Sequence, residues 1–314
     1  MDSKLVRRLA IALVVPLALL AAGCGSSNDK NGSSKDLGSV TVVGQKFPEA
    51  DIMAELYKGL LDHAGFNASV KELGGRDLYL QPLEKGSEVQ ISTDYLSSMT
   101  EALNRQANGD NAKVVASHDV DATLQQLTTL ADKYGLTPLK PAQAQDANAF
   151  AVTKAFATAN NLKTLSDLAA LGKTIKLGAA PDCDKRPDCK IGLENTYGLK
   201  ISSVVGTGFG TDETKADLKS GATQLGQVGT SDGTLDKDGL VLLEDDKGLQ
   251  NAENLVPIAN SAWLKAHPEA ETALNALSGV LTTADLASMI AEVSVGREKA
   301  ADVADQYLKD KGLI

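Results

Sequence analysis

The chain has 314 residues, a formal net charge of −10, and an aromatic content of only 4%. An acidic surface repels phosphate backbones, and no Lys/Arg cluster is interleaved with aromatic residues, so the composition argues against nucleic-acid binding. About 275 residues follow the N-terminal segment, which is enough for one large or two medium domains with cores of their own.

The N-terminal residues have the pattern of a secretory signal peptide with a lipidation site. Lys4, Arg7 and Arg8 precede an apolar run over 9–23, and Cys24 follows at once. The run is shorter than the roughly 18 to 20 residues of a membrane-spanning helix, and it ends in small residues. We expect cleavage after residue 23, lipidation of Cys24, and anchoring of the chain on the extracytoplasmic face of the cell membrane. An uncleaved anchor is the alternative.

Residues 24–39 then form a predicted lipidated Cys and flexible linker. The segment 25–39 contains Ser, Gly, Asn and charged residues without periodicity, a composition that cannot bury a core. Removal of residues 1–23 takes away three positive charges and one negative charge, so the mature chain would carry −12.

The first half of the folded part alternates strands with helices. A strand at 40–44 precedes a helix that Pro48 opens and Gly65 ends. A strand at 68–73 meets Gly74-Gly75 and a short helix that stops at Lys85-Gly86. A third strand at 89–92 and helices at 96–106 and 120–134 follow.

The second half repeats the alternation. A segment from 136 to 149 contains two prolines and is predicted to cross between lobes. Helices are expected at 164–171, 193–197 and 213–219, and strands at 174–177, 201–205 and 224–228. Strands at 240–243 and 255–258 would return the chain to the first lobe, and 261–312 is almost wholly helical.

These elements predict an α/β fold with two lobes and two interlobe crossovers. Lobe 1 is expected to contain 40–143 plus 245–314, and lobe 2 to contain 144–244. Ligands of open α/β sheets bind beyond the carboxyl ends of the strands, so a ligand cleft between the lobes is expected.

The two remaining cysteines lie in the segment PDCDKRPDCK. In an oxidising compartment, a disulfide between Cys183 and Cys189 is the expected state. A metal site would need further ligands, and the three histidines (His63, His118, His267) lie far away in sequence. No metal, no cofactor and no nucleophile or phosphate-loop motif is predicted, so the chain is not expected to be an enzyme.

Several segments in order resemble the osmoprotectant-binding proteins of ABC importers, the glycine betaine, carnitine and choline class. They are GQKFPEADIMAELYKGLL, LEKGSEVQISTDYL, NLKTLSDLAAL, RPDCKIGLENTY, TSDGTL, LVLLEDD and LTTADLASM. The resemblance covers about residues 39–314. It implies the type II periplasmic-binding-protein fold, capture of a small solute, and delivery to permease and ATPase subunits.

In that family the quaternary ammonium of the ligand sits among aromatic faces, which attract a dispersed cation. Matched residue by residue, the resemblance gives seven candidate ligand-binding residues: Gln45, Phe47, Asp94, Tyr95, Asn148, Arg186 and Thr230. Four positions that resemble cage positions hold Ser92, Asn148, Lys190 and Gly229 instead of rings. A full four-ring cage is therefore not expected.

Most of the candidates have a simpler alternative, and Tyr95 could be an ordinary, partly buried side chain. Asp94 could attract a cation or cap the following helix. Arg186 could reach a ligand anion or face solvent, and Phe47 could be a hydrophobic staple rather than a ligand wall. Gln45 and Asn148 could orient a polar ligand or serve as ordinary loop hydrogen-bonding residues.

The prediction from sequence is an extracytoplasmic solute-binding lipoprotein that captures a quaternary-amine osmoprotectant. The same fold could instead bind a different polar or aromatic solute. A surface ligand sensor is a further alternative.

Overall fold

The computed structural model describes residues 36–314. The predicted signal peptide, the lipidated Cys24 and most of the linker lie outside the described residues. The described residues form one compact unit.

Lobe 1 is built on a five-stranded sheet in the order β2-β1-β3-β10-β4. β1 pairs in parallel with β2 and β3, whereas β10 pairs antiparallel with β3 and β4. The strands are β1 Ser39–Gln45, β2 Asn67–Leu73, β3 Ile91–Tyr95, β4 Leu136–Pro138 and β10 Leu255–Asn260.

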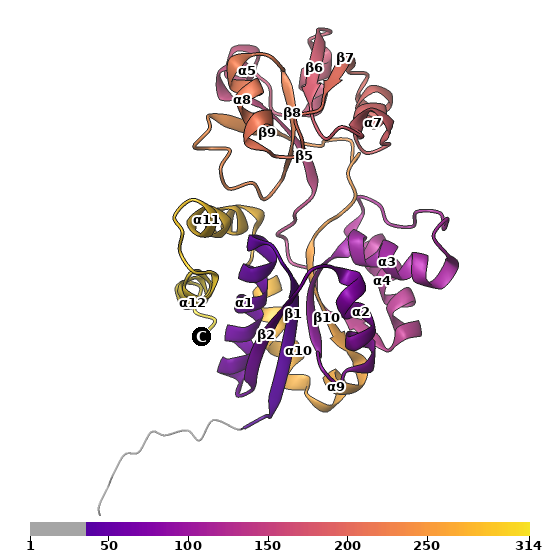
Figure 1. The fold of residues 1–314 in the computed structure, drawn as a ribbon, viewed down its shortest axis with the longest axis vertical. Coiled ribbons are helices and arrows are strands. Elements are labelled where there is room, and N and C mark those ends of the chain that lie inside the picture. Colours follow the sequence, from indigo (N-terminus) through magenta and orange to yellow (C-terminus); the bar gives the residue numbers. More distant parts are fainter. Residues whose placement is uncertain (1–35) are drawn as a thin grey trace, which may run out of the picture. The chain divides into compact units, whose positions relative to one another are not determined.

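Helices cover both faces of this sheet. Successive side chains of β1 point to opposite faces of the sheet. Val42 packs in one apolar cluster with α1 and the C-terminal helices, and Val43 packs in another with α2, α3 and α4. Figure 1 shows α1, α11 and α12 on one side of the sheet and α2, α3 and α4 on the other. The helices are α1 Pro48–Ala64, α2 Arg76–Lys85, α3 Leu96–Asn108, α4 Val120–Ala131, α9 Ser261–Ala266, α10 Pro268–Ser278, α11 Thr283–Ser294 and α12 Ala300–Asp310.

The boundaries of α1 follow from its sequence. Pro48 occupies the first turn, where its missing N–H costs nothing, and Gly65 ends the helix with φ at 106°. Phe47 precedes the first turn in extended conformation. As a result, the residues immediately before and within the first turn of α1 lie at the carboxyl end of β1.

Lobe 2 is built on a second five-stranded sheet, in the order β7-β6-β8-β5-β9. Its strands are β5 Asn148–Thr153, β6 Thr174–Gly178, β7 Lys200–Val205, β8 Leu225–Gly229 and β9 Leu240–Leu243. Its helices are α5 Lys154–Asn160, α6 Leu165–Ala170, α7 Lys190–Gly192 and α8 Asp212–Ser220, with a 3-10 turn at Cys183–Lys185 and a π-helical turn at Leu193–Tyr197.

One strand prediction needs correction. The strand at 240–243 exists, but it does not return the chain to lobe 1, because β9 pairs with β5 of lobe 2, with Leu243 opposite Phe150. The return is made by β10, whose residues are buried throughout in the sheet of lobe 1.

Two connectors join the lobes and are hydrogen-bonded to each other. The amide of Asp146 donates to the carbonyl of Glu253 at 3.0 Å, and the amide of Leu255 donates to the carbonyl of Ala144 at 2.9 Å. An antiparallel bridge between Gln145 and Asn254 lies between these bonds. The interlobe passage is therefore a short two-stranded ribbon.

No single helix among residues 36–314 has the length and apolarity of a membrane span. By length and composition alone, α10 and α11 would meet that test together, but they are bent by 92° at the break between them.

Candidate functional site

Two adjoining cavities, of about 430 and 290 Å³, lie between residues of the two lobes. Asp146 and Phe209 line both. The larger one also contacts Phe47, Glu49 and Gly229, and its remaining lining residues are Pro48, Gly210, Lys215, Ser231, Asp232, Thr234, Ile290 and Ser294. The smaller one is completed by Asn148, Arg186, Asp188, Gln250, Asn251 and Glu253. We call the two cavities together the cleft.

A third cavity of about 650 Å³ is larger, and the predicted residues Asn148 and Thr230 contribute to its lining. Its charged or titratable lining residues are His118, Glu244, Asp245, Asp246 and Lys247. It is lined mainly by the connectors and the 242–252 segment, and its phenylalanine, Phe150, is only 1% exposed. We place the candidate site in the cleft because rings and carboxylates from both lobes meet there.

Lobe 1 contributes the ring of Phe47 to the cleft, and Tyr95, which lines neither cavity, stacks on that ring. Phe47, before α1, stacks on Tyr95, at the end of β3, with ring centroids 6.5 Å apart and planes 17° from parallel. Phe47 lines the larger cavity and remains 36% exposed. The hydroxyl of Tyr95 donates to Oε1 of Glu49 at 2.5 Å.

Lobe 2 contributes Phe209, which the sequence reasoning missed. The ring is 48% exposed and belongs to the loop between β7 and α8. It lies over Gly229, where an added Cβ would be 3.5 Å from the Phe209 ring and 2.9 Å from Oδ1 of Asp146. A ring from a neighbouring loop and a carboxylate thus occupy the space beside this cage-like position.

One sequence signal could have identified Phe209. It lies between Gly208 and Gly210, which both have positive φ, 98° and 61°. Glycines in that conformation bend the backbone sharply on both sides of a large apolar residue, and such a residue in a loop outside any core is a candidate for contact with a ligand.

Three carboxyl groups in the cleft have raised pKa values. Burial, with the nearby Asp146 charge, raises the pKa of Glu49 to about 7, although hydrogen bonds from Tyr95 and Ser231 act in the opposite direction. Burial also raises the pKa of Asp146, whose Oδ1 accepts a 2.6 Å hydrogen bond from Ser231. Burial raises the pKa of Glu253 to about 7 despite its two hydrogen bonds from Ser98.

Asp94 has a different environment from the one predicted. It is 1% exposed, and its carboxylate accepts Nε of Arg76 at 3.0 and 3.1 Å, Nη2 at 2.5 Å, and the hydroxyl of Tyr79 at 2.5 Å. The capping alternative is wrong, because the first three amides of α3 donate to the carbonyls of Asn254 and Ala252 and to the carboxylate of Glu253, and not to Asp94. Asp94 lines neither cavity of the cleft.

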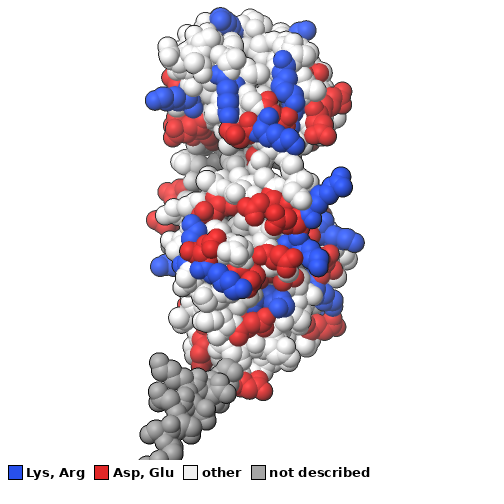
Figure 2. Space-filling view, turned by 90° about the vertical axis from the view of Figure 1, so that its left-hand side faces the viewer, with Lys and Arg blue, Asp and Glu red and all other residues white. Residues whose placement is uncertain are grey.

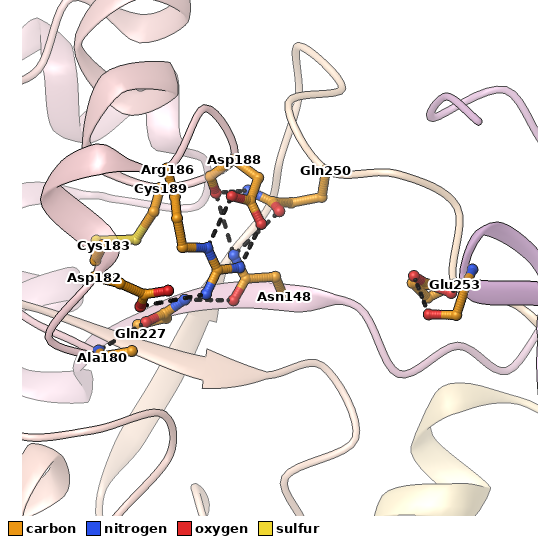
Figure 3. Close-up of polar contacts among 11 residues, drawn as sticks. Asn148, Ala180, Asp182, Cys183, Arg186, Asp188, Cys189, Gln227, Gln250 and Glu253 are labelled. Carbon is orange, nitrogen blue, oxygen red and sulfur yellow. Dashed lines mark hydrogen bonds and ion pairs between the residues drawn. A yellow bond between two sulfur atoms is a disulfide. The ribbon is translucent and has the colours of Figure 1, made fainter. Parts of the chain in front are cut away.

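Asn148 and Arg186 lie together on the lobe 2 wall. Nδ2 of Asn148 donates at 3.2 Å both to the carbonyl of Asp188 and to Gln250, and its Oδ1 accepts from Gln227 at 2.7 Å. Arg186 donates through Nε and Nη2 to the two oxygens of Asp188, at 3.0 and 2.5 Å. Figure 3 shows this network beside the disulfide, with Glu253 lying apart from it.

Gln45 and Thr230 lie outside the cleft lining. Gln45 is half-buried at the end of β1. Oγ1 of Thr230 accepts from the amide of Ala147 at 2.9 Å and donates to the carbonyl of Gln145 at 2.8 Å, so it fastens lobe 2 to a connector.

The predicted disulfide and the cage-like positions can be located in the structure. The disulfide between Cys183 and Cys189 is confirmed, with Cα atoms 5.2 Å apart and both residues buried. Among the cage-like positions, Ser92 is fully buried and Lys190 is paired with Glu194 at 2.6 Å. No cluster of metal-ligating side chains occurs among the described residues.

Comparison with known families identifies the fold and the class of protein. A family model described as the substrate binding domain of the ABC-type glycine betaine transport system matches residues 38–310. The match is to a transport component and not to an enzyme family, in agreement with the sequence analysis.

Solved structures of this class have the same fold. A glycine betaine/carnitine/choline ABC transporter structure shares 23% identity and aligns with a TM-score of 0.77 over 88% of this chain and 98% of its own. YehZ from Escherichia coli shares 24% identity with a TM-score of 0.74, covering 88% and 99%. Lactococcal OpuAC complexed with glycine betaine shares 17% identity with a TM-score of 0.52, covering 88% and 96%. The predicted two-lobed periplasmic-binding-protein fold is confirmed.

Proposed function

The chain belongs to the family of substrate-binding domains of ABC-type glycine betaine transport systems, and from this premise we propose that it captures a quaternary-amine solute in the cleft and delivers it to an ABC permease. In this proposal residues 1–23 are a cleaved signal peptide, and the lipidated Cys24 and the linker to residue 39 tether the receptor outside the membrane. Lobe 1 comprises 40–143 plus 245–314, and lobe 2 comprises 144–244.

The observation that carries the proposal is the combination of rings and carboxylates in one cavity. Phe47 and Phe209 come from different lobes and line the same 430 Å³ space, together with Glu49 and Asp146. An alkylated ammonium group is attracted to ring faces, loses little hydration on burial, and gains further from a nearby carboxylate. The arrangement supports a cage of fewer rings than the resemblance implied, supplemented by acidic groups.

The predicted site residues have unequal support in this proposal. Phe47 forms an aromatic wall of the larger cavity, and Asn148 and Arg186 form part of the polar wall of the smaller one. Tyr95 would act through Phe47 and Glu49, which it contacts, and Gln45, Asp94 and Thr230 would act only through the residues that they support. Phe209, Glu49 and Asp146 are added as proposed ligand contacts.

Uptake requires the cleft to open and close, and the connectors supply a place for that motion. Because rings from both lobes would contact the solute, binding favours the closed arrangement over the open one. The closed form would then be the one presented to the permease.

A different cargo is the second candidate, and one observation favours it. The cage-like positions Ser92, Lys190 and Gly229 carry no ring. Ser92 is fully buried, and Lys190 is paired with Glu194. With fewer rings to hold an ammonium group, the 430 Å³ cavity would suit a bulkier polar or aromatic solute better than a small betaine.

The test is ligand-dependent unfolding of residues 36–314 with choline, glycine betaine, carnitine and a set of aromatic solutes. A true ligand at a hundredfold excess over its dissociation constant adds about 2.7 kcal/mol to the free energy of unfolding. We expect a quaternary amine to raise the melting temperature, and Phe47→Ala and Phe209→Ala to reduce that rise.

The matched control is Leu78→Ala, which removes an exposed apolar side chain on α2 outside the cleft. It should leave the ligand effect unchanged. A response to aromatic solutes, with none to any quaternary amine, would mean that the family assignment stands and the proposed cargo is wrong.

A further inference from the structure

The cleft is strongly acidic. Its described lining residues include five carboxylates but only two cations, Arg186 and Lys215; the carboxylates are Glu49, Asp146, Asp188, Asp232 and Glu253. Figure 2 shows acidic side chains gathered where each lobe borders the other, with Lys and Arg among them. Whether the cleft can attract an anionic group therefore depends on whether Arg186 and Lys215 are already paired within the protein.

Arg186 and Lys215 both form ion pairs with carboxylates of the protein. Arg186 binds both oxygens of Asp188, and its Nη1 lies 3.9 Å from Asp182. Nζ of Lys215 lies 2.7 Å from Asp232, with a side chain only 7% exposed, and it also donates to Thr234 at 2.6 Å. Neither the guanidinium nor the ammonium is left as an unpaired charge for a carboxylate on a ligand.

Glu49 and Asp146 are the opposite case. No Lys or Arg among the described residues forms an ion pair with either, and their side-chain hydrogen bonds come from the neutral hydroxyls of Tyr95 and Ser231. A buried carboxylate without a cation is costly, and two such groups close together are costlier still.

The elements packed around Glu49 and Asp146 supply no unpaired positive charge that could neutralise these two carboxyl groups. From β3, Asp94 is already bound to Arg76. From the turn after β8, Asp232 is bound to Lys215, and α11 presents the uncharged Ile290 and Ser294 to the same cavity. The missing charge must come from a proton or from a ligand.

We propose that the cleft selects ligands of net positive charge, ammonium compounds that carry no carboxylate, with the cationic group bound beside Glu49 and Asp146. The inference rests on the proposed function and narrows it, since the family name covers zwitterionic betaines. A ligand carboxylate would find no free cation in the cleft, because Arg186 is bound to Asp188 and Lys215 to Asp232.

Binding of such a cation is linked to release of a proton. The pKa of Glu49 near 7 means that the free protein holds a proton there for about half of the time at neutral pH. A bound ammonium favours the carboxylate, so the proton leaves to the solvent. Affinity should therefore fall about tenfold as the pH is lowered from 8 to 6, because the ionised form of Glu49 becomes scarce.

The experiment is isothermal titration of residues 36–314 at pH 8 with three molecules of matched shape. Choline is the cation, glycine betaine is the zwitterion, and 3,3-dimethyl-1-butanol is the neutral carbon isostere of choline. We expect choline to bind tighter than either of the others by on the order of tenfold. In buffers of different ionisation enthalpy at pH 7, the choline heats should differ, which reports the released proton.

The variants Glu49→Gln and Asp146→Asn should each remove most of the preference for choline over its neutral isostere. The control Glu55→Gln changes a carboxylate on the same helix that faces the groove beside α12 and should leave the preference intact. Two conservative variants are used because either one alone could disturb folding, which circular dichroism would reveal.

The outcomes separate this inference from the proposed function. Equal or tighter binding of glycine betaine would overturn the inference while the proposed receptor for quaternary amines stands. Retention of the choline preference in both folded variants would overturn it as well. If neither choline nor any betaine binds, the proposed function itself fails.

Discussion

Two buried carboxylates in lobe 1 look alike until their neighbours are compared. Asp94 and Glu49 each accept a tyrosine hydroxyl at 2.5 Å, from Tyr79 and Tyr95. Asp94 also binds the guanidinium of Arg76, whereas the charged neighbour of Glu49 is another carboxylate, Asp146. The first group is complete within the fold, and the second is incomplete without an external positive charge.

This difference shows how a structural carboxylate can be told from a ligand-binding one. Burial and a tyrosine partner are common to both positions, so neither property is diagnostic. The presence or absence of a cationic partner decides, because the cost of burying a charge is offset only by pairing or by protonation.

The largest expected loss of stability follows from removing the cationic partner of Asp94. Arg76→Met would leave Asp94 buried and unpaired and should lower the free energy of unfolding by about 3 to 5 kcal/mol, as measured by denaturant titration. The control is Lys71→Met, which breaks an exposed ion pair with Glu88 and should cost less than about 1 kcal/mol. Similar losses in the two variants would show that the buried pair of Arg76 and Asp94 stabilises the fold no more than an exposed pair. The distinction between Asp94 and Glu49 would then lose its basis.

The next effect concerns the incomplete group and its pH dependence. Because the pKa of Glu49 is raised in the folded state, folding retains a proton that the unfolded chain has lost between about pH 4.5 and 7. The stability contribution is present at low pH and is lost as the pH rises through that window. The loss from pH 5 to 8 should be about 2 to 3 kcal/mol.

Glu49→Gln should make the stability profile shallower, since the amide does not titrate. The substitution should not remove the pH dependence of stability completely, because the pKa values of Asp146 and Glu253 are raised as well. Urea titrations of both proteins at several pH values provide the measurement. A variant with the slope of the original chain would show that Glu49 is not the titrating group.

The smallest effects come from the two tyrosines. Tyr79→Phe removes a donor from a buried, ion-paired carboxylate and should cost about 2 kcal/mol. Tyr95→Phe should cost less than about 1 kcal/mol, because a protonated Glu49 needs its acceptor bonds less. Thermal unfolding at pH 6 compares the two, and a larger loss at Tyr95 would contradict the assignment.

The sequence predicted the fold well where local signals are strong. Pro48 and Gly65 mark the two ends of α1, and the short Cys183 to Cys189 spacing in an expected oxidising compartment was enough to predict the disulfide. The partner of the strand at 240–243 was not predictable in this way, because a short apolar strand carries no information on which sheet it joins.

The site was harder to predict because its residues are brought together by the tertiary fold. Asp94 was selected from its place after a strand, but Arg76, which neutralises it, comes from a different element, α2. Phe209 and Asp146 are 63 positions apart and share a cavity only because the 208–210 loop and a connector converge there. Position along the chain indicates which strand end a residue occupies, but not which charges will surround it.

The hydrogen bonds between the two connectors limit how the lobes can move. Sliding one connector along the other would break the bonds from Asp146 to Glu253 and from Leu255 to Ala144, whereas flexing both together preserves them. We therefore expect any opening of the cleft to bend the two connectors together and to leave these hydrogen bonds intact.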